Sequence, residues 1–178
     1  LEFNAEPFNI KEYTTNLKHL FTDAMNRKKL DFIVDIDENL PEIIIGDKQR
    51  LNQILTNLLS NAVKFTDKGF IKLITKVINQ RENYADIEFT VQDSGIGIAK
   101  SKLSTVFDKF TQEESDITRK FGGTGLGLTI AKELILLFDG EIKVKSTQDE
   151  GSTFTVTLTF GIDKFIKQSS MKKEEEKS

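Results

Sequence analysis

The chain has 178 residues, a formal net charge of −3 and no cysteine. This length suits one domain with a two-layer core, and 38% hydrophobic against 30% charged residues is typical of a globular protein. The composition excludes disulfides, thiolate catalysis and cysteine-bound metals, and the weak negative charge disfavours nucleic acid or an anionic membrane as a partner. No apolar stretch is long enough to cross a bilayer. We therefore expect a soluble segment, with any membrane anchor in another part of a parent chain.

Hydrophobic periodicity predicts a helix and then a strand in the first part of the chain. Apolar residues recur at helical spacing from 10 to 24, and the polar run 26–29 ends the helix. Residues 30–36 alternate in part and are expected to form a strand. A break at 39–41 separates this strand from a short apolar run at 43–45.

A second helix is predicted over 48–65, with Asp47 as its N-cap. Its apolar residues cover one broad face, and Asn57, Asn61 and Lys64 form a separate polar stripe that borders this face. An asparagine carbonyl can join phosphates and waters around Mg²⁺, and a lysine can neutralise phosphate charge. An isolated helix asparagine would only bond locally, but three aligned polar groups predict the edge of a cleft.

A hairpin of two strands, 70–79 and 84–92, leads directly into Asp93. Gly95 and Gly97 follow, and glycines allow the backbone to approach a flat ligand closely. A carboxylate at this position can accept a hydrogen bond from an exocyclic amine such as that of adenine. Taken alone, the same residues would also fit an ordinary Asp-Gly turn with a solvated carboxylate.

The stretch 94–125 is glycine-rich, charged and nearly without periodicity, apart from a short helical segment at 100–107. Such a stretch predicts a long functional loop, and a lid is the natural interpretation. The glycine cluster 122–128 is not a dinucleotide fingerprint, because the third glycine position is Leu128, and no Gly-Lys-Ser/Thr follows it. It opens a helix at Gly125, where free N–H groups can receive phosphate oxygens, unless it is only a flexible linker.

The last elements predicted are one helix and two strands, at 126–138, 141–146 and 152–160. We expect one domain over 1–163, followed by a polar, low-complexity linker or tail over 164–178. The expected fold is an α/β (α+β) two-layer sandwich. It consists of a mixed, mostly antiparallel sheet of about five strands packed on three helices, with a lid over the ligand.

Five motifs in order resemble the catalytic and ATP-binding domain of sensor histidine kinases. This HATPase or Bergerat-fold domain belongs to the superfamily that also contains gyrase and chaperone ATPases. The asparagine box, first glycine box, phenylalanine box, second glycine box and final glycine box are matched by residues 53–66, 93–98, 107–112, 122–128 and 151–154. The resemblance covers residues 6 to 160, and the residues around the lid are similar to those of hybrid kinases, which carry a fused receiver domain.

At the phosphate end, the resemblance implies a site for Mg-ATP. Asn61 would coordinate Mg²⁺, Asn57 would lie near the phosphates and Lys64 would contact them. Arg119 and Lys120 would contact the phosphates or the transition state. The residues implied in catalysis are Asn57, Lys64 and Arg119.

At the base end, Phe65 would lie against adenine and Asp93 would bind its amine. Thr153 would support Asp93 through a water molecule. Gly95 and Gly97 would make room for the base, and Phe107 and Phe110 would anchor the lid. The other positions implied in nucleotide binding are Ile98, Gly123, Thr124, Gly125, Leu126, Gly127 and Leu128.

The implied activity is that of a protein-histidine kinase, and the implied location is the cytoplasm. An asparagine amide cannot accept a proton at neutral pH, and gyrase-like and chaperone relatives carry a glutamate at the position of Asn57, so phosphotransfer is favoured over hydrolysis. His19 is the only histidine and lacks the context of an acceptor box. The acceptor is therefore expected on a dimerisation domain, with a response regulator or fused receiver domain as the next partner. A hydrolytic ATPase, a protein-serine kinase and a non-catalytic nucleotide-binding module remain alternatives.

Overall fold

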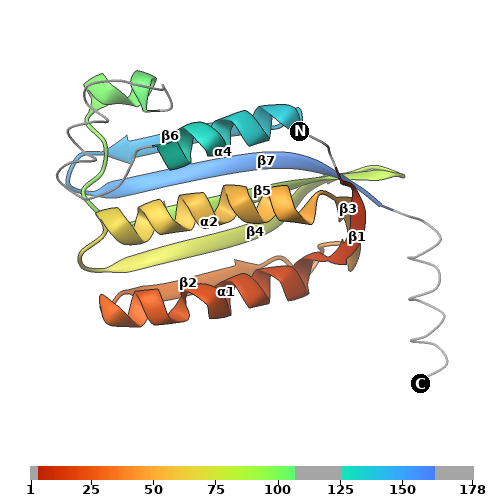
Figure 1. Cartoon of the computed structure of the whole chain (residues 1–178), viewed down its shortest axis with the longest axis horizontal. Helices are drawn as coiled ribbons and strands as arrows, with labels where there is room; N and C mark the ends of the chain where they lie inside the picture. Colours follow the sequence, from red (N-terminus) through yellow and green to blue (C-terminus); the bar gives the residue numbers. More distant parts are fainter. Residues whose placement is uncertain (1–3, 107–125, 163–178) are drawn as a thin grey trace.

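The computed structural model describes residues 4–106 and 126–162, which form two layers (Figure 1). Helices cover one face of an open sheet. In the described residues the helices are α1 (Ile10–Arg27), α2 (Lys48–Phe65), α4 (Leu126–Leu137) and the short 3₁₀ helix η1 (Lys100–Thr105). The strands are β1 (Glu6–Asn9), β2 (Asp31–Ile36), β3 (Ile43–Gly46), β4 (Phe70–Gln80), β5 (Tyr84–Asp93), β6 (Glu141–Thr147) and β7 (Gly151–Gly161).

The sheet is mixed and mostly antiparallel, which confirms the predicted α/β sandwich. Its strand order is β1-β3-β7-β5-β4-β2, and β6 also pairs with β7. The pair β2 and β4 is parallel, with Val34 opposite Leu73. The described residues form seven strands, whereas the sequence predicted about five.

The two additional strands are β1 and β3, which have four residues each and pair with one another. A strand this short holds too few alternating positions for a periodic pattern to be recognised. Pro7 also argues against a strand, because proline has no N–H to donate to a neighbour. It is tolerated here because β1 lies at the edge of the sheet, where Pro7 stands opposite Ile45.

The helices pack their apolar faces on the sheet and on one another. The predicted cap of α2 is confirmed, since the Asp47 side chain accepts a hydrogen bond from the N–H of Arg50 at 3.1 Å. The residues that α2 buries are Leu51, Ile54, Leu55, Leu58, Leu59 and Ala62. Each fully buried leucine or isoleucine of this set contributes about 1.5–3 kcal/mol by leaving water. This apolar face fixes the rotation of α2 and therefore the direction of its polar stripe.

One end of the molecule gathers several element termini (Figure 1). The C-terminus of α2, the end of β5, the start of β7 and η1 lie there, at the left of the view. The helical segment predicted at 100–107 is a 3₁₀ helix that ends at Thr105. None of the helices in the described ranges is long and apolar enough to cross a membrane.

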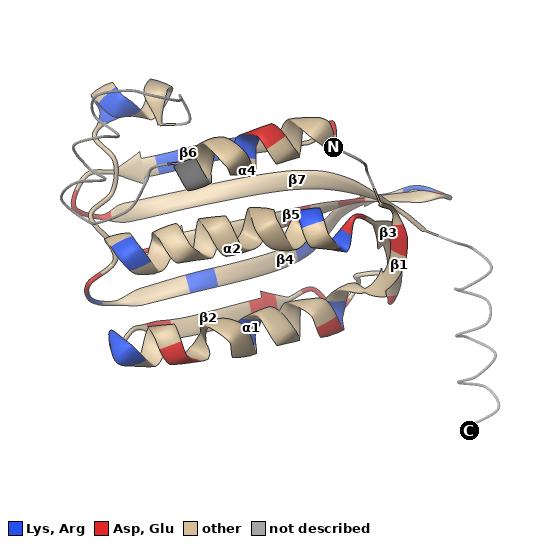
Figure 2. Cartoon of the chain, viewed as in Figure 1, with Lys and Arg blue, Asp and Glu red and all other residues tan. Residues whose placement is uncertain are grey.

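Acidic and basic side chains are mixed over the face seen in Figure 2. Along α1 and α4, Lys and Arg lie among Asp and Glu, whereas the charged residues of α2 are all basic, and neither sign forms a continuous stripe on this face. This distribution agrees with the small net charge of −3. It gives the described face no electrostatic footprint for a polyanion.

Candidate functional site

The candidate site is built around Asp93, the last residue of β5. Ala85, Ile87, Phe89 and Val91 are buried on one face of this strand. Asp93 continues their alternation, so its carboxyl group points to the same side and is only 7% exposed. The register of β5 thus carries a charged group to the buried face of the sheet at its open end.

The Asp93 carboxyl group is held by two backbone N–H groups. Its Oδ1 accepts a hydrogen bond from Gly95 at 2.9 Å and from Ser152 at 3.3 Å. Burial raises the pKa of the Asp93 carboxyl above its ordinary value, and the two backbone hydrogen bonds oppose this rise only in part. The Asp93 carboxyl is therefore fixed in orientation, and a further hydrogen-bond donor would stabilise its charged form.

Gly95 and Gly97 are required by the packing of the protein itself. A Cβ on Gly95 would overlap the carbonyl oxygen of Phe65, and a Cβ on Gly97 would overlap that of Thr147. Gly97 also has a φ of +69°, which side-chain-bearing residues rarely adopt. The sequence predicted that these glycines allow close approach to a ligand. The structure adds a second reason for them, because neighbouring backbone atoms occupy the space that a Cβ at either position would need.

The loop after Asp93 is fastened to the turn between β6 and β7. The N–H of Ile98 donates to Oγ of Ser146 at 2.7 Å, and the N–H of Asp149 donates to the carbonyl of Ile96 at 2.6 Å. Ser146 Oγ lies 2.8 Å from Ser152 Oγ. Ser146 and Ser152 are positioning residues that the sequence analysis missed.

Thr153, which the resemblance placed near Asp93 through a water molecule, is not the β7 residue that stands opposite Asp93. Asp93 stands opposite Ser152, and Thr153 stands opposite Gln92. Ser152 is buried in phase with Phe154, whereas Thr153 is out of phase and half-buried. The signal was present in the sequence, because the even-numbered apolar residues of β7 place Ser152, and not Thr153, on the core side.

The polar stripe of α2 reaches the same end of the molecule. Asn57, Asn61 and Lys64 are all half-buried in the second half of the helix. Lys64 Nζ lies 5.9 Å from the ring centroid of Phe65, within the range of a cation–π contact. The last turn of α2 also meets the Asp93 loop, since the N–H of Ile96 donates to the carbonyl of Phe65 at 3.1 Å.

The start of α4 forms the third part of this end. Leu126 and Gly127 are its first two residues, and Leu128 in the first turn packs against the core, as does Ile98 of the loop. Because α4 runs beside α2 (Figure 1), its positive N-terminal end points to the region where α2 ends. The predicted positions that lie outside the described residues are Phe107, Phe110, Arg119, Lys120, Gly123, Thr124 and Gly125.

His19 is not one of the residues that this arrangement brings together. It is exposed on α1, as expected for a solvated residue, and α2 lies between α1 and α4 (Figure 1). Within the described residues no three His, Cys, Asp or Glu side chains cluster to hold a metal ion. A divalent cation here would depend on neutral oxygen ligands such as Asn61 and on oxygens of its substrate.

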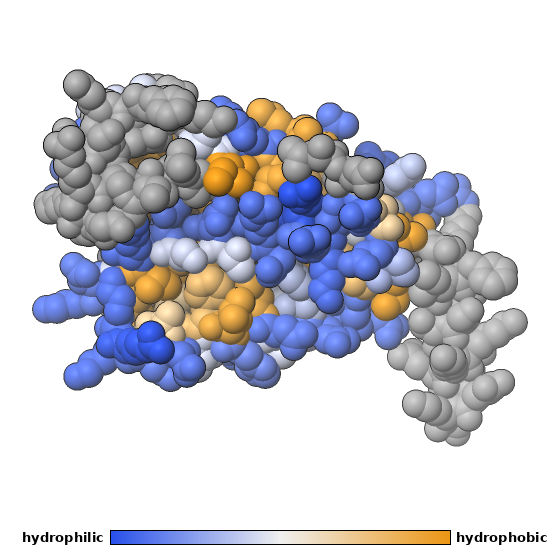
Figure 3. All heavy atoms as spheres, viewed as in Figure 1, coloured by the Kyte–Doolittle hydropathy of each residue, from blue (hydrophilic) through white to orange (hydrophobic). Residues whose placement is uncertain are grey.

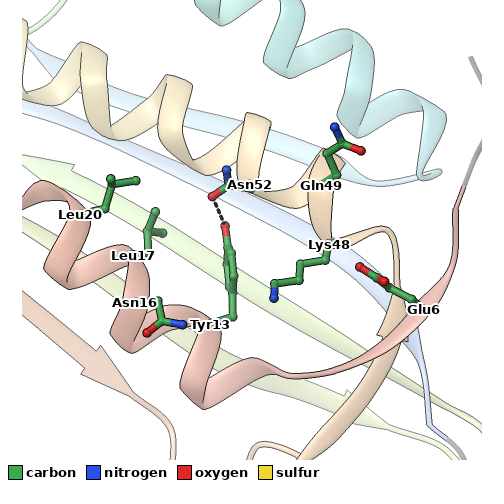
Figure 4. Close-up of a pocket in the computed structure, with 8 residues that line it drawn as sticks. All are labelled: Glu6, Tyr13, Asn16, Leu17, Leu20, Lys48, Gln49 and Asn52. Carbon is green, nitrogen blue, oxygen red and sulfur yellow. Dashed lines mark hydrogen bonds between the residues drawn. The ribbon is translucent and has the colours of Figure 1, made fainter.

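A separate hollow between α1 and α2 does not belong to the candidate site. Figure 3 shows apolar side chains gathered between these helices, and Figure 4 shows the hollow nearer the N-terminus of α2. It has a volume of about 460 Å³, and Tyr13 donates to Asn52 across it at 3.1 Å. Burial raises the pKa of Tyr13 well above its ordinary value, so the hydroxyl stays a neutral donor. This hollow and Asp93 lie at opposite ends of α2.

Comparison with known proteins gives consistent relatives. Residues 46–162 match the family described as "Histidine kinase-, DNA gyrase B-, and HSP90-like ATPase". The chain is 42% identical over 171 residues, 96% of its length, to hybrid signal transduction histidine kinase L of Dictyostelium discoideum. It is 39% identical over 152 residues, 85% of its length, to the sensor protein GacS of Pseudomonas syringae pv. syringae. The chain spans 10% of the first relative and 17% of the second.

Solved structures of histidine kinases share the fold. Full-length ShkA in complex with AMPPNP matches 92% of this chain with a TM-score of 0.78 and 28% identity, over 32% of the ShkA chain. The nucleotide-free catalytic domain of histidine kinase ThkA matches 89% of this chain with a TM-score of 0.69 and 26% identity, over 95% of its own length. By its sequence, its sheet topology and the residues around Asp93, this chain belongs to the family of histidine kinase-, DNA gyrase B- and HSP90-like ATPases.

Proposed function

We propose that this chain binds Mg-ATP and donates the γ-phosphoryl group to a histidine on a separate phosphoacceptor domain. The observation that carries the proposal is the buried Asp93 carboxylate. Both backbone donors reach its Oδ1, so Oδ2 can accept from the exocyclic amine of adenine. Because burial penalises the charged form of Asp93, a hydrogen-bond donor supplied by the base offsets part of this cost.

The phosphate end is supported by the polar stripe of α2 and by the start of α4. Lys64 supplies a positive charge there, and the first N–H groups of α4 face the same end of the molecule. Asn61 is the residue that would hold Mg²⁺, which when bound neutralises charge on the phosphates. The donor set fits this ion, since Mg²⁺ takes oxygen ligands and keeps several waters.

The side chain of Asn57 favours transfer over hydrolysis. An amide cannot take a proton from water at neutral pH, so Asn57 can orient a phosphate but cannot activate water as a general base. His19 is exposed on α1, and α2 lies between α1 and α4 (Figure 1). The acceptor is therefore assigned to another domain, and the names of the hybrid histidine kinases among the relatives support a phosphoacceptor and a receiver as partners.

The test combines the 178-residue chain with a phosphoacceptor domain from a related kinase and γ-labelled ATP. We expect acid-labile label on the histidine of that domain and little free phosphate. Steady ATP turnover that disappears with Asn57→Ala would show a hydrolytic ATPase. Acid-stable label would indicate a serine kinase, and ATP binding without any label would indicate a non-catalytic module.

A further inference from the structure

Thr66 holds a polar atom that the fold leaves unsatisfied. It follows the last residue of α2 as the C-cap, with extended backbone at φ −116° and ψ 113°. Its side chain is fully buried at 0% exposure, and within the described part of the chain its Oγ1 has no hydrogen-bond partner. A buried hydroxyl without a partner is a net cost, and native structures keep few of them.

This hydroxyl lies against the loop that holds Asp93. A Cβ built on Gly95 would come within 2.8 Å of Thr66 Oγ1, which places the hydroxyl directly beside the Gly95 backbone. The N–H of the same Gly95 donates to Asp93 Oδ1 at 2.9 Å. Thr66 therefore adjoins the residue that fixes the Asp93 carboxyl, at the point where α2 meets the loop.

One other buried hydroxyl in the described residues lacks a partner, and its position differs. Thr75 lies within β4 opposite Phe89, in the interior of the sheet. Its Oγ1 is as buried as that of Thr66, but it is not next to the Asp93 loop. Comparing variants of Thr66 and Thr75 therefore distinguishes the effect of losing any buried hydroxyl from the effect of losing one beside the Asp93 loop.

The chemistry of adenine supplies what Thr66 lacks. The edge of the base that carries the exocyclic amine also carries a ring nitrogen, N1, which only accepts hydrogen bonds. An ionised carboxylate has no proton to donate, so Asp93 can serve the amine but not N1, whereas a hydroxyl can donate. The two side chains together offer the acceptor and the donor that this edge requires.

We propose that Thr66 is a positioning residue for the adenine base. Its hydroxyl donates toward N1, directly or through one water molecule that the base traps beside Asp93, and it gains this partner only in the complex. The proposal rests on the proposed function, because it presupposes an adenine nucleotide at Asp93. It adds a contact to the base end, where ATP and ADP are identical.

The experiment is calorimetric titration of ATP and ADP into the 178-residue chain and three variants. Thr66→Val, which replaces the hydroxyl by a methyl group of similar size, should weaken both nucleotides by the same factor, about three- to tenfold. Thr66→Ser should stay within about twofold of the unchanged protein, since it keeps the hydroxyl. Thr75→Val should leave the affinity for both nucleotides unchanged. In the absence of nucleotide, the melting temperature of Thr66→Val should be no lower than that of the unchanged protein.

A nucleotide analogue tests the same contact without a variant. 1-Deaza-ADP has a C–H in place of N1, so the unchanged protein should bind it about three- to tenfold more weakly than ADP. Thr66→Val should bind ADP and 1-deaza-ADP with nearly equal affinity, because this variant lacks the hydroxyl that donates to N1. This arm holds even if Thr66→Val fails to fold.

Equal affinity of Thr66→Val and the unchanged protein, or of ADP and 1-deaza-ADP, would overturn the role of Thr66. An equal loss of nucleotide affinity in Thr75→Val would also overturn this role, because it would show that replacing any buried threonine hydroxyl has the same effect. If the unchanged protein binds neither ATP nor ADP, the proposed function itself fails, and this outcome is distinct from the others.

Discussion

Asp93 owes its position to strand alternation and its orientation to two backbone N–H groups. Neither depends on a side chain other than its own. A substitution that keeps the shape of Asp93 therefore changes its chemistry while leaving the backbone around it in place. This makes the residue suited to an isosteric test.

Asp93→Asn should weaken the binding of adenine nucleotides about 10- to 100-fold, because a hydrogen bond to a charged group contributes about 1.5–3 kcal/mol. Calorimetric titration with ADP measures this loss. Asp86→Asn is the matched control on the same strand, where Asp86 bonds to Arg81 and Thr159 at the surface. Unchanged affinity in Asp93→Asn would refute its assigned role.

The same residue predicts a pH dependence of stability. Because burial raises the pKa of Asp93 above its ordinary value of 3.8, the folded state holds this proton more tightly than the unfolded chain. The stability contributed by the protonated group is therefore complete below about pH 3.8 and is lost as pH rises through the folded pKa. Urea denaturation should show Asp93→Asn gaining stability over the unchanged protein at pH 7, with a smaller gain at pH 4. A gain that does not depend on pH would contradict this account.

At the level of elements, the loop from Ser94 to Ile98 connects the end of α2 to the turn between β6 and β7. It is held by backbone contacts with Phe65 on one side and by Ser146 on the other. A change in this loop is therefore transmitted to Asp93 through Gly95. The loop has no room for a side chain at Gly95, where a Cβ would overlap backbone.

Gly95→Ala should lower the free energy of unfolding by about 1–3 kcal/mol, because an overpacked site forces the backbone to shift. Nucleotide affinity should fall as well, since the shift displaces a donor to Asp93. Gly161→Ala is the control, because the nearest atom to its Cβ would be Ile45 Cβ at 3.3 Å. The stabilities of the two variants are compared by their urea denaturation midpoints. Equal losses of stability would contradict the prediction, because they would show that the backbone near Gly95 accommodates a Cβ without cost.

Elements with a strong local signal were predictable, and those made by distant contacts were not. The bounds of α2 follow from the cap at Asp47 and a regular apolar face. β1 pairs with β3, and β3 also pairs with β7, and no local pattern in either short strand encodes these pairings. The steric need for Gly95 likewise depends on the carbonyl of Phe65, which lies far away in the sequence. Ser152 could have been chosen over Thr153 from the alternation of β7.

Over the whole molecule, His19 is exposed on α1, Asp93 ends β5, and α2 lies between α1 and α4 (Figure 1). We therefore expect that the chain does not phosphorylate its own histidine. With labelled ATP alone, we expect no label on the chain. The His19→Ala variant should transfer label to an added phosphoacceptor domain at the same rate as the unchanged protein. Label that appears on the isolated chain and disappears with His19→Ala would contradict this prediction.

Two backbone N–H groups orient the Asp93 carboxyl, which in the proposed function would bind the adenine ring that ATP and ADP share. ADP would then keep every contact made at this end and would compete with ATP for the same site. Discrimination between them falls to the phosphate end alone. The rate of phosphotransfer would then follow the ATP to ADP ratio of the surroundings, and product inhibition would couple signal output to energy supply.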